Sequence, residues 1–228
     1  IRLKELSGQL PSKNTSHGVA KKILGVDEGS LYLHQRIHGS AWSSDVPKVV
    51  GGGSPYFDRA KQGATLVPRR LWFVETTTSG MGGSKKLPFV QTDSGITGRG
   101  TWSGVHISGP VEERFLFYTY LADRLLPYTV YDPYLIVVPV VEAQDSFEVL
   151  RSADAAERGF SRLQAWLNRA EQVWEGGRGA KAQEMTLYRR LDYGSYLSNQ
   201  NPSASYRVIY NHSGAHIAAC VLYTNQEK

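Results

Sequence analysis

The stretch GATLVPRRLWFVE, residues 63–75, is the part of the sequence from which the fold can be read most directly. A small turn opens it, and Pro68 stands before two adjacent arginines, Arg69 and Arg70. Four large apolar residues and a glutamate follow. A run of β-branched and aromatic residues bounded by turn residues is typical of a strand packed in a core. We therefore expect a strand over 65–76, with the arginine pair at its beginning.

Similar short apolar runs separated by turn residues recur along the chain and predict a β-rich fold. Further strands are expected over residues 30–35, 134–141, 206–211 and 216–223. Pro139 should confine its strand to an edge or a bulge, because proline cannot donate a hydrogen bond to a neighbouring strand. The single cysteine, Cys220, belongs to the last strand, where we expect a buried and inert thiol.

Two helices and a shorter third are expected among these strands. Acidic residues open the segment 112–125, which suits the helix dipole, and prolines flank it. In the segment 152–175, apolar residues recur every three or four positions after Ser152, a suitable N-cap, and a glycine pair follows. The third helix covers 183–191. The sequence thus predicts a mixed α+β fold with β-rich sheets and two or three helices.

Two segments, 51–63 and 78–104, are poor in structural signals, and the second is rich in Gly, Ser and Thr and has few aliphatic residues. We expect the second to be a long Gly/Ser-rich excursion without a core element, and in a compact domain such an excursion is usually functional or disordered. The 228 residues suit one domain, 1–228, in which 1–62 could form a small N-terminal subregion. The chain does not begin with Met, which suggests a fragment of a longer protein.

Composition limits the possible classes of function. The sequence has no apolar run long enough to span a membrane, and its first residues do not resemble a signal peptide. One cysteine excludes a disulfide framework and a thiolate metal site within the chain, and it favours a reducing, cytoplasmic setting. The net charge of +5 permits binding to a polyanion without requiring it.

Metal and phosphate sites find little support in the motifs. Two histidine pairs have the spacing that would place both imidazoles on one face of a helix, but glycines accompany them and no third ligand is evident. These pairs are His34 with His38 and His212 with His216. In SGMGGSKK, Ser84 stands where a phosphate-binding loop needs a glycine before the lysine. We therefore expect neither a metal nor a cofactor in this chain.

A nuclease hypothesis depends on Asp132 and Glu142, whose spacing some nucleases use. Such sites usually place a lysine two residues after the glutamate, and here that residue is Gln144. The alternative is a turn aspartate before a strand and a glutamate at the strand's end. NPSA, residues 201–204, begins like the Asn-Pro-Pro-aromatic loop of amino-group methyltransferases, but it lacks the aromatic residue that stacks on the flipped base.

Four blocks in the order of the sequence resemble the C-terminal part of large adenine amino-group (N-6) DNA methyltransferases of restriction–modification systems, including the single-chain restriction–methylation type. The blocks are GATLVPRRLWFVE, LLPYTVYDPYLIVVPV, WLNRAEQVWEGGR and LDYGSYLSNQNPSASYRVIYNHSGAHIAACV, which together span residues 63–221. The resemblance implies a target-recognition region that binds double-stranded DNA. In the parent enzyme, a separate catalytic domain would bind S-adenosylmethionine and flip the adenine out of the duplex. This chain alone would not methylate DNA.

The residues expected to contact DNA are basic or polar. Those that determine which DNA sequence is recognised should lie in the excursion over 78–104. They are Arg69, Arg70, Lys85, Lys86, Arg99, Arg207, Asn211 and His212. We expect Lys85, Lys86 and Arg99 to lie on flexible backbone. Arginine can bond a guanine edge or a phosphate, and asparagine can read adenine. The alternative is that these side chains are solvated or pair with acids. Tyr206 and Tyr210 could stack on an extruded base or pack against a core edge.

A second hypothesis is a structural or protein-interaction module that docks on a catalytic domain or on a partner subunit. The aromatic residues and the amphipathic face of the helix over 152–175 would form the docking face. It would then bind no DNA itself. An independent hydrolase or nuclease is a third hypothesis, and it has only the carboxylate spacing behind it.

Overall fold

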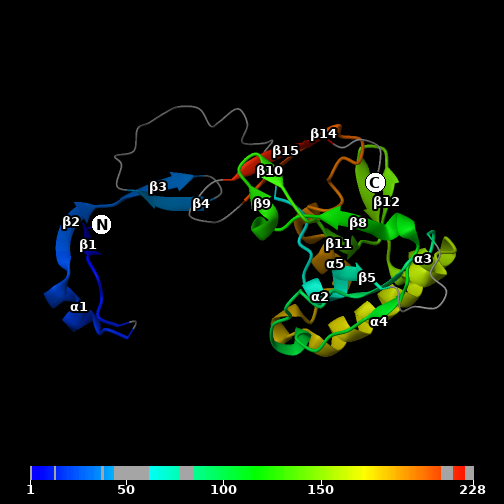
Figure 1. Ribbon diagram of the computed structural model, residues 1–228, viewed down its shortest axis with the longest axis horizontal. Coiled ribbons are helices and arrows are strands. Elements are labelled where there is room, and N and C mark those ends of the chain that lie inside the picture. The colour runs from blue at the N-terminus through cyan, green and yellow to red at the C-terminus, as the bar shows by residue number, and fades with distance from the viewer. Residues whose placement is uncertain are drawn as a thin grey trace. The chain divides into compact units, whose positions relative to one another are not determined.

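The computed structural model of the chain describes most of its residues. The described ranges are 2–12, 14–36, 39–43, 62–77, 85–211 and 218–223. The chain divides into two compact units, Ile1–Ala60 and Lys61–Lys228. Helices and antiparallel sheets both occur, so the predicted α+β class is confirmed (Figure 1).

The first unit contains two antiparallel strand pairs and one helix, drawn in blue in Figure 1. β1 (Arg2–Ser7) pairs with β2 (Gly25–Ser30), and α1 (His17–Ile23) lies between these strands in the sequence. β3 (Tyr32–Arg36) pairs with β4 (Gly39–Ser43). β3 overlaps the strand predicted over 30–35.

A five-stranded antiparallel sheet, in the order β7-β6-β5-β11-β8, forms the centre of the second unit. Its strands are β5 (Phe73–Thr76), β6 (Phe89–Thr92), β7 (Ser108–Pro110), β8 (Leu116–Thr119) and β11 (Tyr134–Val137). Phe73 and Val74 are both buried. Because successive residues of a strand point to opposite faces, both faces of the sheet are covered at β5.

The opening stretch is a strand only in its last part. Arg69–Trp72 forms one helical turn, α2, and the strand begins at Phe73. Leu71 and Trp72 are completely buried on this turn. The apolar run therefore enters the core as predicted, but the predicted strand over 65–76 was too long. A short apolar run is compatible with a helical turn and with a strand alike.

The predicted excursion over 78–104 contributes to the core. β6 lies inside it with Val90 completely buried, and Ile96 is buried beyond the strand. The expectation of a segment without a core element was wrong for residues 85–104, because β5 offers β6 a pairing partner that local composition does not reveal. Residues 78–84 lie outside the described residues.

The helix predicted over 112–125 does not form. The segment contains β8 between two single 3-10 turns, η3 (Glu113–Phe115) and η4 (Ala122–Arg124). β8 pairs with β11 along four residues. Consecutive bulky and aromatic side chains favour a strand when a partner strand is present. The pairing of β8 with β11 therefore stabilises a strand here, although the acidic residues at the start of the segment favour a helix.

Pro139 separates two strands that were predicted as one over 134–141. β11 ends at Val137, and β12 (Val140–Ala143) pairs with β13 (Ser146–Val149) in a separate hairpin. β11 is an interior strand between β5 and β8, so the expected edge position was wrong. The proline lies beyond the strand's end, where no ladder hydrogen bond is required of it.

Two helices, α3 (Ser152–Glu157) and α4 (Ser161–Gly177), replace the single helix predicted over 152–175. Gly159 between them has a φ of 77°. Its N–H donates to the carbonyl of Ala156, and the next N–H, of Phe160, donates to Ala155. These are the bonds of a Schellman motif, which ends a helix at a glycine. The predicted glycine pair does lie at the end of α4.

The apolar face predicted for this helix is buried in α4. Leu163, Leu167, Ala170 and Trp174 are buried, and so is Trp166, whose indole donates to the carbonyl of Leu71 at 3.2 Å. Ser152 is not the N-cap of α3, because Arg151 holds that position. The third predicted helix is shorter, α5 (Leu187–Leu191). Further 3-10 turns are η2 (Gly100–Trp102), η5 (Ala180–Ala182) and η6 (Tyr193–Ser195).

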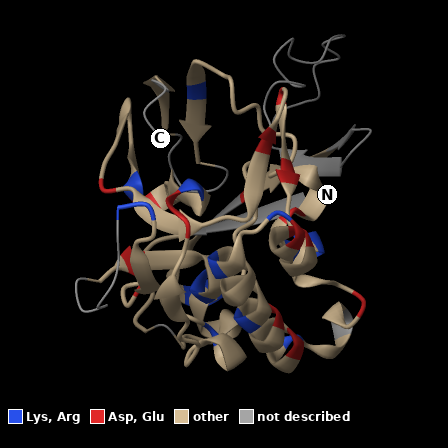
Figure 2. Cartoon of the chain, turned by 90° about the vertical axis from the view of Figure 1, so that its right-hand side faces the viewer, with Lys and Arg blue, Asp and Glu red and all other residues tan. Residues whose placement is uncertain are grey.

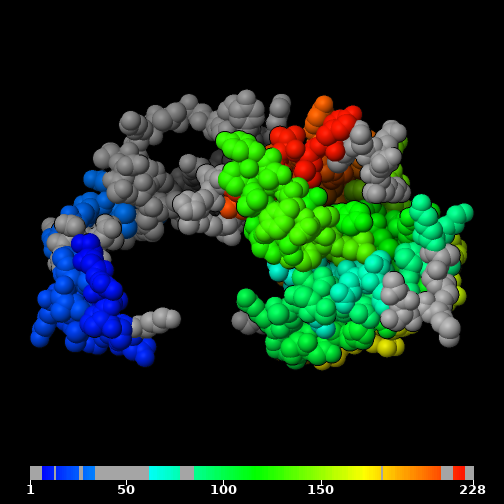
Figure 3. Space-filling view, in the orientation of Figure 1, coloured from blue at the N-terminus to red at the C-terminus, as the bar shows by residue number. Residues whose placement is uncertain are grey.

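Two more strand pairs lie side by side on the second unit. β9 (Leu125–Leu126) pairs with β10 (Thr129–Val130), and β14 (Tyr206–Tyr210) pairs with β15 (Ala219–Tyr223). The N–H of Tyr128, between β9 and β10, donates to the carbonyl of Ala219 at 2.9 Å. Figure 3 shows the green β9–β10 segment next to the red β15. β14 and β15 agree with the strands predicted at the C-terminal end, and Cys220 is buried as expected.

Candidate nucleic-acid interface

The side chain of Arg70 forms hydrogen bonds inside the second unit. Its half-buried guanidinium makes four hydrogen bonds of 2.7–3.0 Å to the backbone carbonyls of Asp93, Ile96 and Val105. A guanidinium has five N–H donors, so these bonds nearly exhaust it. The structure therefore does not support a DNA contact from Arg70. We assign it instead to holding residues 93–106, here called the Arg99 loop.

The Arg99 loop has a second anchor on the last turn of α4. Trp102 stacks on Trp174, with ring centroids 5.7 Å apart and an interplanar angle of 16°. The Thr101 hydroxyl donates to the carbonyl of Gly177 at 3.1 Å. A Cβ at Gly177 would lie 2.7 Å from the Trp102 ring, so a glycine permits this close approach. The expectation of flexible backbone around Arg99 was therefore wrong: the loop is held at two places.

Four of the predicted cations are exposed. They are Arg69, Lys85, Lys86 and Arg99. Within the described part of the chain, none of their side chains takes part in a hydrogen bond or an ion pair. These side chains are free to meet an external anion.

The four exposed cations lie at two different ends of the sheet. β5 and β6 are antiparallel, with Val74 opposite Thr92 and Thr76 opposite Val90. Arg69 precedes β5 and the Arg99 loop follows β6, so these two lie at one end. Lys85 and Lys86 precede β6 and lie toward the other end. The four-residue strand alone is about 10 Å long. The register therefore keeps Lys85 and Lys86 apart from Arg69 and the Arg99 loop.

Two of the predicted residues on β14 and beyond it have internal partners. Arg207 donates to the carbonyl of Asn201 at 2.9 Å and to the side-chain oxygen of Gln200 at 3.4 Å. The side-chain oxygen of Asn211 accepts from the N–H of Ala218 at 2.9 Å. These bonds stabilise the ends of the strand pair. His212 lies outside the described residues.

β14 and β15 have an uncharged, exposed face. The sequence did not decide whether the tyrosines of β14 would be exposed or packed against the core. Tyr206 lies opposite Tyr223, and Val208 lies opposite Val221. Each of these four side chains is between 61 and 65% exposed, and the two tyrosine rings are 5.1 Å apart. We call these four residues the Tyr206 face. The period-two alternation in YRVIY could have indicated it, because it places the tyrosines and Val208 on one side of the strand.

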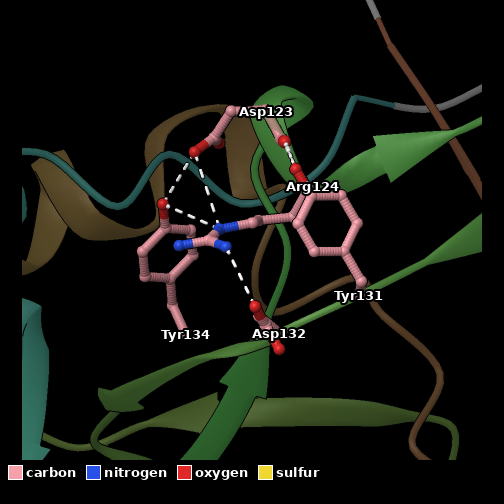
Figure 4. Close-up of polar contacts among 5 residues, drawn as sticks. All are labelled: Asp123, Arg124, Tyr131, Asp132 and Tyr134. Carbon is pink, nitrogen blue, oxygen red and sulfur yellow. Dashed lines mark hydrogen bonds and ion pairs between the residues drawn. The ribbon is translucent and has the colours of Figure 1, made fainter.

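Arg124 supports the β9–β10 pair beside β15 (Figure 4). Its guanidinium lies 5.4 Å from the ring centroid of Tyr131 and 5.0 Å from that of Tyr134. It donates to the hydroxyl of Tyr134 at 3.2 Å and to the carboxylate of Asp132 at 3.3 Å. The hydrogen bond with Tyr134 is the largest cause that raises the pKa of Arg124, and the electrostatic interactions with Tyr134, Asp123 and Asp132 raise it further. This cation is occupied within the fold.

The surface charge is mixed in sign. Basic and acidic segments are interspersed in the view of Figure 2. Arg158 pairs with Glu148, and Arg178 pairs with Glu175. Opposite charges that form an ion pair cancel much of each other's field in solution. Any attraction for a polyanion therefore depends on the exposed cations that have no partner within the described ranges, rather than on a uniformly basic face.

The described residues give little support to a catalytic site. No group of three or more His, Cys, Asp or Glu side chains among them could hold a metal ion. Asp132 pairs with Arg124 in the turn before β11, whereas Glu142 lies in β12. The side chain of Asn201 accepts from the N–H of Ser203 at 2.7 Å, which is a local turn contact. Asp132 and Asn201 are thus explained by their local contacts.

Comparisons with known protein families, with curated proteins and with solved structures returned no match. Among the helices that the structure describes, none has the length and apolar character required to cross a membrane.

Proposed function

We propose that this chain is the target-recognition part of an adenine-specific DNA methyltransferase of a restriction–modification system, and that it binds double-stranded DNA in the cytoplasm. The four sequence blocks over residues 63–221 support this proposal. In the parent enzyme, S-adenosylmethionine and the methyl-transfer step would belong to a catalytic domain on the same polypeptide or on a partner subunit. The part played by this chain would be binding and orientation.

The observation that best supports the proposal is that Arg99 is exposed on a loop whose backbone is held in place. This arginine is exposed and has no partner among the described residues, while its loop is fixed by Arg70 on one side and by Trp102 on the other. A binding side chain on a held backbone loses less conformational entropy when it contacts its target. Arg69 lies at the same end of the sheet, so both arginines could contact one stretch of duplex.

The test is the binding of a labelled DNA duplex, followed by fluorescence anisotropy at several salt concentrations. Affinity should fall steeply between about 50 and 200 mM salt, because each phosphate contact releases counterions. Arg99→Ala should weaken binding by about tenfold, within the range for the loss of one arginine contact. Lys85→Ala shows separately whether the opposite end of the sheet takes part.

Arg162→Ala is the matched control. It removes the same charge from another exposed arginine, in the first turn of α4, whose side chain has no partner in the described part of the chain. The Arg99 loop packs on the last turn of this 17-residue helix, about 20 Å away along its axis. If Arg99→Ala and Lys85→Ala both bind DNA as the parent does, neither side chain reads or holds the duplex. Absence of salt-dependent binding by the parent would refute the proposal as a whole.

The Tyr206 face favours a second candidate function, docking on a catalytic domain. It is apolar and uncharged, and contiguous exposed apolar residues are a frequent mark of protein interfaces. Val208→Lys would place a charge at its centre. Under this hypothesis, the substitution abolishes a stable complex with the methyltransferase domain and leaves the DNA affinity unchanged. A complex that survives Val208→Lys would contradict docking through this face.

A further inference from the structure

A shallow cavity of about 170 Å³ lies between η3, β8 and the β12–β13 hairpin, away from the Arg99 loop. Its walls include Phe117, Val140 and Phe147. The rings of Phe117 and Phe147 meet edge to face, with centroids 6.4 Å apart and an interplanar angle of 85°. For scale, an apolar protein cavity of about 150 Å³ holds one benzene molecule. The cavity therefore suits one aromatic ring, with any second ring at its open side.

Two side chains of opposite charge, Arg114 and Glu142, also line this cavity. Within the described residues, they do not form an ion pair with each other or with any other charged group. Arg114 has its guanidinium carbon 4.9 Å from the ring centroid of Phe160 and 5.6 Å from that of Phe115. These cation–π contacts orient the guanidinium and leave its N–H groups available.

The register of the hairpin places Glu142 beside an aromatic wall. Glu142 lies directly opposite Phe147, and side chains of such cross-strand partners lie on the same face of a hairpin. Arg114 is supplied by another segment. An arginine, a glutamate and two phenylalanines thus line one cavity.

From this arrangement we propose that the cavity binds a guanine base. Guanine offers two adjacent acceptors, O6 and N7, which match the fork of an arginine. Its N1–H and exocyclic amine are donors that match a carboxylate. Its planar body suits the walls formed by Phe117 and Phe147. The inference rests on the proposed function only in that the guanine would come from DNA, as a base extruded from the duplex, because pairing with cytosine occupies N1–H and the amine.

Other ligand classes match the cavity less well. A carboxylate or a free phosphate would be repelled by Glu142, and an organic cation would be repelled by Arg114. A purely apolar ring would leave both charged side chains without hydrogen-bond partners. Adenine places an amine where guanine has O6, so it would direct a donor toward the donors of Arg114.

The test is isothermal titration calorimetry of the full chain with GMP, CMP and AMP, which share the phosphate and differ in the base. We expect GMP to bind at least about tenfold more tightly than AMP. Glu142→Gln keeps the size of the side chain but replaces one acceptor by a donor, and it should weaken GMP binding by about tenfold. Arg114→Lys keeps the charge, loses the fork and should have a similar effect.

Asp145→Asn is the matched control, because it removes an exposed carboxylate from the turn of the same hairpin but outside the cavity. It should bind GMP like the parent chain. Equal affinities for the three nucleotides, or equal effects of Glu142→Gln and Asp145→Asn, would overturn the proposal. Circular dichroism of each variant establishes that it remains folded.

Duplex binding by the same samples separates this inference from the proposed function. If GMP binds as expected but the chain shows no salt-dependent affinity for duplex DNA, the guanine site stands and the proposed function fails. If the duplex binds and GMP does not, the guanine site alone is refuted.

Discussion

Arg69 and Arg70 are neighbours in the sequence, yet their side chains have different surroundings. Arg69 is exposed, while Arg70 makes four hydrogen bonds to carbonyls of the Arg99 loop. Both belong to the single helical turn α2. Successive residues of a helix point about 100° apart, so one arginine faces solvent while the next reaches the loop. The two therefore have separate, testable roles.

Arg70→Ala should lower the free energy of unfolding by about 2–4 kcal/mol, because it leaves carbonyl groups of the loop without donors and removes charge-assisted hydrogen bonds. Arg70→Lys should recover only part of this loss, since an ammonium lacks the fork. Arg69→Ala is the control and should change stability by less than about 0.5 kcal/mol. Urea denaturation measures all three. Equal stability of the two alanine variants would contradict the assigned role.

Tyr188 has no part in the proposed interface, but its contacts give the chain a predictable response to pH. Its hydroxyl donates to the carboxylate of Glu171 and accepts from the N–H of Ser152 at 2.8 Å. Burial raises the pKa of Tyr188 well above its usual value, and the hydrogen bond and charge of Glu171 raise it further. The folded chain therefore keeps this proton at a pH where the unfolded chain loses it.

The stabilisation from this pKa difference is complete below about pH 10, where an unfolded tyrosine is protonated, and it is lost as the pH rises above that value. The free energy of unfolding should fall more steeply between about pH 10 and pH 12 in the parent than in Tyr188→Phe. Tyr128→Phe, at a side chain that is 92% exposed, is the control and should follow the parent. Parallel curves for the parent and Tyr188→Phe would refute this prediction.

At the scale of the secondary-structure element, Glu112 shows how a correct local signal can act on a different helix. Acidic residues suit a helix N-terminus, and the sequence assigned Glu112 to a helix that begins in its own segment. In the structure, its carboxylate accepts from the backbone N–H groups of Arg162 and Leu163, at 3.0 and 2.8 Å. It therefore caps α4 from a distant part of the chain.

Glu112→Ala should lower the free energy of unfolding by about 1–2 kcal/mol, the usual cost of losing an N-terminal cap. Glu113→Ala removes the same charge from the next residue, which is exposed and accepts neither of the two capping hydrogen bonds, and should cost less than about 0.5 kcal/mol. Thermal unfolding followed by circular dichroism compares the two. The capping role would be disproved by equal losses.

At the scale of the whole molecule, the second unit contains its own hydrophobic core. The buried cluster extends from Leu66 to Leu197 and includes residues of the central sheet, α4 and α5. A domain with an independent core can in principle fold alone. A chain of residues 61–228 should therefore unfold cooperatively, with a denaturant midpoint close to that of the same unit in the full chain. A molten or insoluble product would show that this unit depends on residues 1–60.

The sequence predicted the features that depend on neighbouring residues. The three-and-four spacing of apolar residues located the buried face of α4, and short apolar runs located β5, β11, β14 and β15. Gly159 carried a usable signal that was missed, since glycine after a helical segment favours a Schellman ending. Of the predicted DNA-contacting residues, Arg69, Lys85, Lys86 and Arg99 are exposed and unpaired within the described residues, which keeps them candidates.

Periodicity and composition by themselves determined the mixed α+β class and the buried face of α4, because side-chain burial follows the local repeat of a helix or a strand. Only the tertiary structure decided that Leu116–Thr119 is a strand, that Arg70 is internal, and that Arg114 and Glu142 share a cavity. The reason is that strand pairing, clamping hydrogen bonds and cavities join residues far apart in the chain. Their free energy is gained only when the fold brings those residues together.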